Sequence, residues 1–338
     1  MTAIDRQLDA HRSRAADGTG PGSSGRGLPV TTRGLVVIYR SEGHDVAALS
    51  GVDLHVGAGE MVGLLGPSGA GKSTLLTVFG GLTAPSAGSA VVGGHDLRSL
   101  TPSALDELRA GQIGLVLQGA ARNLVPYLTP RQNVEVAQVP ARRTARSLPT
   151  VEDVLGPLGV GDLADRELST LTPGQAQLVA IAVGVACEPG LLLVDEPTSQ
   201  LDHASRDRVL RALHDVNQRV GSTVVVVTHD PDVAAALPRT VTIRDGRVGA
   251  EGRQGEEFAV VSADGALPLA GAALADFPPG ALVRLHHDGR AWLLLPADAV
   301  PPGQDDATPE GEGEGASDSV AAREASTQRP GDPGAPTT

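Results

Sequence analysis

The segment from Gly66 to Thr74, Gly-Pro-Ser-Gly-Ala-Gly-Lys-Ser-Thr, constrains this chain more than any other stretch. It fits the pattern G-x-x-x-x-G-K-[S/T], and it lies between the apolar run 62–66 and a helix-like stretch that begins at Lys72. Closely spaced glycines let the backbone wrap around an anion, and the start of the helix adds its dipole. The segment therefore predicts a strand, a loop that binds phosphate oxygens, and a helix.

Lys72 is the only lysine among 27 basic residues, so every other basic side chain is an arginine. The wide planar guanidinium of arginine fits poorly in a loop built for an ammonium group. We expect Lys72 to contact the β- and γ-phosphates of a nucleotide and Ser73 to ligate Mg²⁺.

Three short apolar runs, at 62–66, 191–195 and 223–229, have the length of buried strands. Between the last two, residues 203–219 place apolar side chains on one helical face. This alternation predicts an α/β fold with a parallel sheet.

The composition of the chain argues against several classes of protein. One cysteine in 338 residues rules out a disulfide framework, and 2 % aromatics with a net charge of −13 argue against a nucleic-acid partner. No apolar run reaches the roughly 18–20 residues of a membrane span, and the first twenty residues show no apolar signal region. A soluble intracellular protein is predicted.

The chain divides into four predicted parts. Residues 1–31 are a polar leader expected to be disordered, 32–250 are the α/β domain, and 299–338 are an acidic tail expected to be disordered. Between them, residues 256–298 are predicted to form a small β-rich module of two hairpins. Their turns are expected at Asp264-Gly265 and Asp288-Gly289.

Polar side chains follow two of the apolar runs. Asp195 and Glu196 come at the end of LLLVD, and His229 ends TVVVVTH. Asp195 fits a group that organises Mg²⁺, and Glu196 fits a general base for the attacking water. His229 is expected to contact the γ-phosphate.

Taken in order, seven motifs across 32–250 resemble those of the ATP-binding subunit of an ABC transporter, a family with a P-loop core, an antiparallel β subdomain and a helical subdomain. They are Tyr39 as an adenine-stacking residue, the phosphate loop, Gln118 of the Q-loop, LTPGQ (171–175) as the signature, LLLVDEP (191–197), SQLD (199–202) with Asp202, and His229.

The resemblance assigns three sets of residues. The catalytic set is Lys72, Gln118, Glu196 and His229. The metal set is Ser73, Gln118 and Asp195. The ATP-binding set is Tyr39, Gly66, Pro67, Ser68, Gly69, Ala70, Gly71, Lys72, Ser73, Thr74, Thr172, Gly174, Gln175 and Asp202.

The family resemblance also implies ATP and Mg²⁺ as cofactors and a second ATP-binding subunit, identical or different. The two subunits form a head-to-tail dimer, in which each ATP lies between the phosphate loop of one and the signature of the other. A membrane permease is the implied partner, which places the chain in the cytoplasm on the inner face of the membrane.

The signature departs from the family's usual Leu-Ser-Gly-Gly-Gln. Thr172 keeps a hydroxyl, but Pro173 replaces a glycine and removes an N–H group, and Leu178 stands where an arginine is usual. We expect weakened recognition of the γ-phosphate from across the dimer, with hydrolysis retained.

The stretch 113–137, with Asn123-Leu-Val-Pro126 and Asn133-Val134, resembles the lipoprotein-release and macrolide-export type, which works with FtsX-like permeases. Two alternatives stay open: the ATPase of a methionine-type importer, which often carries a C-terminal regulatory domain, and a soluble regulatory ABC ATPase with weak turnover. The module 256–298 faintly resembles AbrB-type domains. Its basic residues are only two, Arg284 and Arg290, which is too few for strong affinity to a phosphate backbone, so a dimerisation or regulatory role is favoured over DNA binding.

Overall fold

The computed structural model describes residues 26–41, 44–144, 147–253, 256–261, 265–269 and 272–297. The chain divides into two compact units, the first ending at Ala273 and the second beginning at Leu274. The predicted tail, 299–338, and most of the predicted leader lie outside the described residues.

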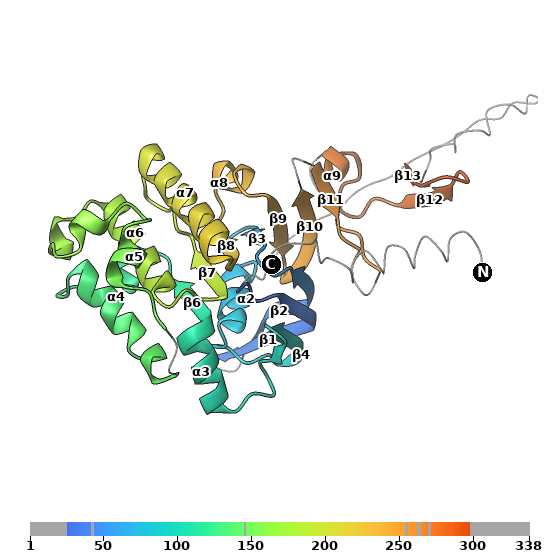
Figure 1. Cartoon of the computed structure of the whole chain (residues 1–338). Coiled ribbons are helices and arrows are strands. Elements are labelled where there is room, and N and C mark those ends of the chain that lie inside the picture. Colours follow the sequence, from blue (N-terminus) through green and yellow to red (C-terminus); the bar gives the residue numbers. More distant parts are fainter. Residues whose placement is uncertain are drawn as a thin grey trace, which may run out of the picture. The chain divides into compact units, whose positions relative to one another are not determined.

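A seven-stranded sheet forms the centre of the first unit (Figure 1), in the order β11-β10-β9-β3-β8-β7-β6. Its strands are β3 (Met61–Leu65), β6 (Ile113–Val116), β7 (Leu191–Asp195), β8 (Thr223–Val227), β9 (Arg239–Arg244), β10 (Arg247–Arg253) and β11 (Glu256–Ala259). The pairs among β9, β3, β8, β7 and β6 are parallel, as the apolar runs predict.

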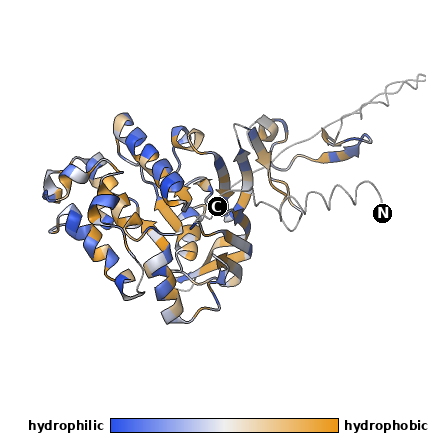
Figure 2. Cartoon of the chain, viewed as in Figure 1, coloured by the Kyte–Doolittle hydropathy of each residue, from blue (hydrophilic) through white to orange (hydrophobic). Residues whose placement is uncertain are grey.

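Both faces of the parallel strands are buried. Along β7, Leu191 and Leu193 join one hydrophobic cluster, while Leu192 and Val194 join the other. Side chains alternate between the two faces of a strand, so a sheet covered on both sides needs a continuous apolar run. Figure 2 shows these central strands in hydrophobic colours and α7 (His203–Val220) with mostly hydrophilic ones.

A four-stranded antiparallel sheet packs with the first, in the order β2-β1-β4-β5. Its strands are β1 (Val30–Ser41), β2 (His44–Val56), β4 (Ala87–Val92) and β5 (His95–Asp96). The predicted leader ends earlier than expected, because Val30 is fully buried in β1 and pairs with Val56 and Val92.

Helices cover the parallel sheet on both sides. They are α2 (Lys72–Phe79), α3 (Pro102–Gln112), α4 (Pro130–Gln138), α5 (Val151–Leu155), α6 (Pro173–Val185), α7 and α8 (Pro231–Ala235), with α9 (Ala272–Asp276) further along. Within the first unit, α2 shares a cluster with strands of both sheets. The helices α4, α5 and α6 group together in Figure 1 as the expected helical subdomain. No helix among the described residues is long and apolar enough to cross a membrane.

The first predicted hairpin of the 256–298 module is wrong. Strand β11 pairs antiparallel with β10, with Ala250 opposite Ala259, and so extends the seven-stranded sheet. Residues 266–269 form no strand, and Asp264 lies outside the described residues. The open edge of β10 offers a row of backbone hydrogen-bonding groups, which outcompetes the local Asp-Gly turn signal.

The second predicted hairpin is confirmed in the second unit. Strands β12 (Val283–His287) and β13 (Trp292–Pro296) pair antiparallel. Gly289 has φ +91°, and the Asp288 carboxylate accepts hydrogen bonds from the backbone N–H groups of Arg290 and Ala291, both at 2.8 Å. The Asp-Gly pair therefore shapes this turn as predicted.

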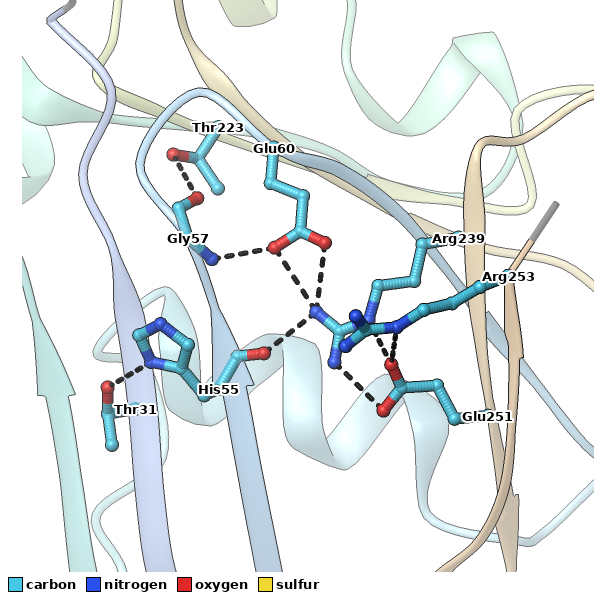
Figure 3. Close-up of polar contacts among 8 residues, drawn as sticks. All are labelled: Thr31, His55, Gly57, Glu60, Thr223, Arg239, Glu251 and Arg253. Atoms are coloured by element: carbon cyan, nitrogen blue, oxygen red, sulfur yellow. Dashed lines mark hydrogen bonds and ion pairs between the residues drawn. The ribbon is translucent and has the colours of Figure 1, made fainter. Parts of the chain in front are cut away.

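Figure 3 shows an ionic network at the edge of the parallel sheet where β3 and β9 begin. Arg239, whose side chain is 10 % exposed, donates to both Glu60 oxygens at 3.0 and 3.1 Å and to Glu251 at 2.8 and 3.1 Å. It also donates to the His55 carbonyl at 2.9 Å, while Arg253 pairs with Glu251 from the solvent side. One guanidinium thus joins the end of β2, the residue before β3, and strands β9 and β10.

Replacing Arg239 with methionine should lower the free energy of unfolding by about 3–5 kcal/mol, because it leaves the carboxylates of Glu60 and Glu251 without their shared partner. Burial alone would raise the pKa of Glu251, but hydrogen bonds from Arg239 and Arg253 outweigh it and hold that pKa below its usual value. Those bonds therefore stabilise the fold at neutral pH, and the stabilisation is lost as acid protonates Glu251.

Urea unfolding of the two proteins at pH 7 measures the difference. Arg253→Met is the matched control: it removes a guanidinium from the same carboxylate, but its side chain is 60 % exposed, so we expect a loss of about 1 kcal/mol or less. Equal losses in the two variants would contradict the central role given to Arg239.

Candidate functional site

The phosphate loop joins the end of β3 to the start of α2. Gly66 and Gly71 have φ of +138° and +100°, which glycine adopts readily. A Cβ atom at Gly66 would lie 2.0 Å from the Ile243 carbonyl oxygen, and one at Gly71 would lie 2.4 Å from that of Ala48. Glycine is therefore required at both positions by backbone conformation and by space.

Lys72 opens α2 and is 8 % exposed. Its Nζ donates to the carbonyl oxygens of Gly66 and Pro67, at 2.7 and 2.8 Å. The ammonium is therefore held within the loop by neutral carbonyls, which a phosphate oxygen would outcompete because it carries charge.

Two carboxylates face this loop from the end of β7. Asp195 Oδ1 accepts a hydrogen bond from the Ser73 hydroxyl at 3.4 Å. Burial raises the pKa of the Asp195 carboxyl above its usual value, and the bond from Ser73 opposes this. Such a carboxylate gains from a cation placed beside it.

Glu196 follows with φ +47°, a left-handed conformation that is costly outside glycine. Its backbone N–H donates to the Val227 carbonyl of β8 at 2.9 Å. Its Oε1 lies 2.7 Å from Nδ1 of His229, which follows β8. The strained turn thus brings a 12 % exposed carboxylate to a 66 % exposed imidazole.

One cavity of about 310 Å³ brings most of the predicted residues together. The residues that line it and that the sequence predicts for the site are Ser68, Gly69, Gly71, Lys72, Ser73, Thr74, Gln118, Asp195, Glu196 and His229. Ala48 and Val227 also line it and were not predicted, since neither carries a chemical signal in the sequence. Gly66, Pro67 and Ala70 belong to the same loop but do not line the cavity.

Five predicted residues lie elsewhere. Tyr39 is 44 % exposed on β1. Thr172 and Gln175 form a reciprocal cap at the start of α6: the Thr172 hydroxyl accepts from the Gln175 backbone, and the Gln175 side chain accepts from the Thr172 backbone at 2.9 Å. Asp202 caps α7 by accepting from the Ser205 backbone at 2.7 Å.

Gly174, the fifth, makes a close contact. A Cβ atom there would lie 2.5 Å from the Ser205 hydroxyl, so the start of α6 rests directly on the first turn of α7. Pro173 occupies the first helical position, where no intrahelical N–H bond is lost. Leu178, in place of the usual arginine, is 5 % exposed in the hydrophobic cluster under the helices.

A parallel sheet with a glycine-rich loop running into a helix, and with carboxylates at the carboxyl ends of its strands, defines a P-loop nucleotide hydrolase. Comparison with known proteins identifies the family within this class. The ABC transporter family model matches residues 49–199. The chain is 42 % identical over 208 residues to the lipoprotein-releasing system ATP-binding protein LolD of Anaeromyxobacter dehalogenans, covering 60 % of this chain and 85 % of that protein.

Two other similarities agree with this. The methionine import ATP-binding protein MetN of Streptomyces coelicolor is 38 % identical over 251 residues, covering 71 % of this chain and 70 % of that protein. The ATP-binding cassette MJ0796, solved as a dimer in a post-hydrolysis state with ADP and Pi, superposes with a TM-score of 0.59 at 32 % identity, over 66 % of this chain and 98 % of that one. The chain belongs to the ABC transporter family, as an ATP-binding subunit that hydrolyses ATP.

Proposed function

We propose that this chain powers an FtsX-like membrane permease through ATP-driven closure of a head-to-tail dimer. The cavity shared by Lys72, Ser73, Gln118, Asp195, Glu196 and His229 carries the ATP-hydrolysing part of the proposal. The similarity to LolD supports the choice of an FtsX-like permease. Thr172, Gly174, Gln175 and Asp202 lie outside it, which supports a site completed by a second subunit.

Within that dimer we assign the groups as follows. Lys72 and the loop N–H groups bind the β- and γ-phosphates, and Tyr39 stacks on adenine. Glu196 takes a proton from the attacking water, while His229, 2.7 Å from Glu196, orients that water and the γ-phosphate. Closure couples ATP occupancy to movement, because the closed state alone offers ATP both halves of the site.

The residues present fit Mg²⁺. Ser73, Asp195 and Gln118 offer hydroxyl, carboxylate and amide oxygens in one cavity, the donor type that Mg²⁺ prefers. Among the described residues, no group of three or more His, Cys, Asp or Glu side chains is placed to hold a metal, so the phosphates and water would complete the shell. Bound there, the ion would neutralise charge on the phosphates.

The methionine-type importer stays the second candidate, supported by the similarity to MetN over 251 residues. Both candidates place the chain on the cytoplasmic face of the membrane. They differ in the permease, so the experiment presents each one to the same ATPase.

The purified chain is mixed in lipid nanodiscs with the FtsX-like permease of its own genome, and separately with a methionine-type importer channel from the same source. We expect the first to retain the chain through affinity purification and to change its ATPase rate, and the second to do neither. Retention and stimulation by the importer channel alone would replace the proposal with its alternative.

A further inference from the structure

Arg206 lies in the first turn of α7, outside the cavity that binds the phosphates. Its side chain is 17 % exposed and makes three contacts. Nη1 lies 3.1 Å from Oδ2 of Asp230 and 3.1 Å from Oδ2 of Asp232, and Nη2 lies 2.8 Å from Nδ1 of His203. Asp230 follows His229 directly and Asp232 lies at the start of α8, so Arg206 joins α7 to the segment that follows His229.

Asp230 is held on both carboxylate oxygens. Oδ1 accepts from the Asp232 backbone N–H at 2.9 Å and caps α8, while Oδ2 accepts from Arg206 at 3.1 Å. The Asp230 backbone N–H donates to the hydroxyl of Thr228, which is fully buried, at 3.1 Å. Arg206 is the contact that ties this segment to a different helix.

Among the described residues the imidazole of His229 has one hydrogen-bond partner, Glu196, so its position depends on its backbone. Its side chain is 66 % exposed, and its Nδ1 lies 2.7 Å from Oε1 of Glu196. A side chain this exposed takes its position mainly from its backbone, which is fixed by Thr228 on one side and by Asp230 on the other. Errors of about 1 Å in such a group cost large factors in rate.

We infer that Arg206 is a positioning residue for hydrolysis: by holding Asp230 from α7, it fixes the backbone that aims His229 at Glu196 and the γ-phosphate. The inference rests on the proposed roles of Glu196 and His229. The same turn of α7 carries Ser205, on which Gly174 of the signature rests, so the support for His229 is anchored beside the residues that face the second subunit.

The test compares Arg206→Met, Arg206→Lys and Arg208→Met in the full chain, with kcat, KM for ATP and the thermal midpoint measured for each. Arg208 is the matched control, since it is an exposed arginine of the same helix whose Nε donates to the Ala204 carbonyl of that helix at 3.4 Å. For Arg206→Met we expect kcat to fall about 10-fold with KM and the midpoint unchanged. Arg206→Lys should restore part of kcat, and Arg208→Met should match the unaltered protein.

Asp230→Asn provides a second route if Arg206→Met folds poorly. Asparagine still caps α8 but loses the charge that Arg206 binds. We expect a similar fall in kcat, and no further fall in the double variant Arg206→Met/Asp230→Asn, because both changes break the same contact between Arg206 and Asp230. An unchanged kcat in Asp230→Asn or in folded Arg206→Met would overturn the inference, as would additive losses.

Glu196→Gln, measured in the same assay, distinguishes a failure of the roles proposed for the cavity residues from a failure of the role of Arg206. If it hydrolyses ATP at the normal rate, the proposed roles in the cavity fail. If it is inactive while the Arg206 variants keep full kcat, only the role of Arg206 fails.

Discussion

Replacing Lys72 with alanine should reduce ATP turnover by about 10²–10³-fold or more, because it removes a fixed charge from the place where charge develops on the transferred phosphate. In the structure Lys72 is 8 % exposed, and its ammonium donates to two neutral loop carbonyls, which a charged phosphate oxygen outcompetes. Steady-state ATPase assays at saturating Mg²⁺ and ATP measure the effect, and binding of a fluorescent ATP analogue measures the loss of affinity.

Lys72→Arg is the informative companion, since it keeps the charge and changes only its shape. All twenty-six other basic side chains of the chain are arginine, so Lys72 is the one position at which lysine is kept. We expect Lys72→Arg to be nearly as inactive as Lys72→Ala. Normal turnover in either variant, with the fold intact by circular dichroism, would contradict the assignment of this site.

The cavity could be predicted from the sequence because its parts obey local rules. The phosphate loop, LLLVD and TVVVVTH each place polar groups directly after an apolar run. In a parallel sheet the carboxyl ends of the strands meet at one edge, so β3, β7 and β8 bring Lys72, Asp195 and His229 together without any knowledge of the loops between them.

Other features depend on contacts that no local pattern reveals. The partners of Arg239 include Glu60, 179 residues away, so the network of Figure 3 carries no sequence signal. The Asp264-Gly265 signal predicts a separate hairpin, but β11 instead pairs with the open edge of β10. The left-handed backbone of Glu196 could not be predicted from the sequence either. Glutamate rarely adopts this conformation, and the surrounding fold imposes it.

That strained glutamate supports the second large prediction. Glu196→Gln should lower kcat by about 10²–10³-fold while ATP still binds, because glutamine keeps the shape of the side chain but cannot accept the proton of the attacking water. The amide can still hydrogen-bond His229, so the 2.7 Å contact and the turn should survive. With hydrolysis blocked, ATP should hold two subunits together, and size-exclusion chromatography with Mg²⁺ and ATP should show a dimer that the unaltered chain forms only briefly.

Glu188→Gln is the matched control. Glu188 has nearly the same left-handed backbone, φ +45° against +47°, but it lies outside the cavity and pairs with Arg26. Its substitution tests whether amidation of a strained glutamate harms the protein in itself, and we expect turnover to stay within twofold of normal. Loss of activity in both variants would indicate that amidation damages the fold, rather than that Glu196 accepts a proton in the reaction. A Glu196→Gln protein that turns over ATP normally would require a different base, and with it a different account of why this turn is strained.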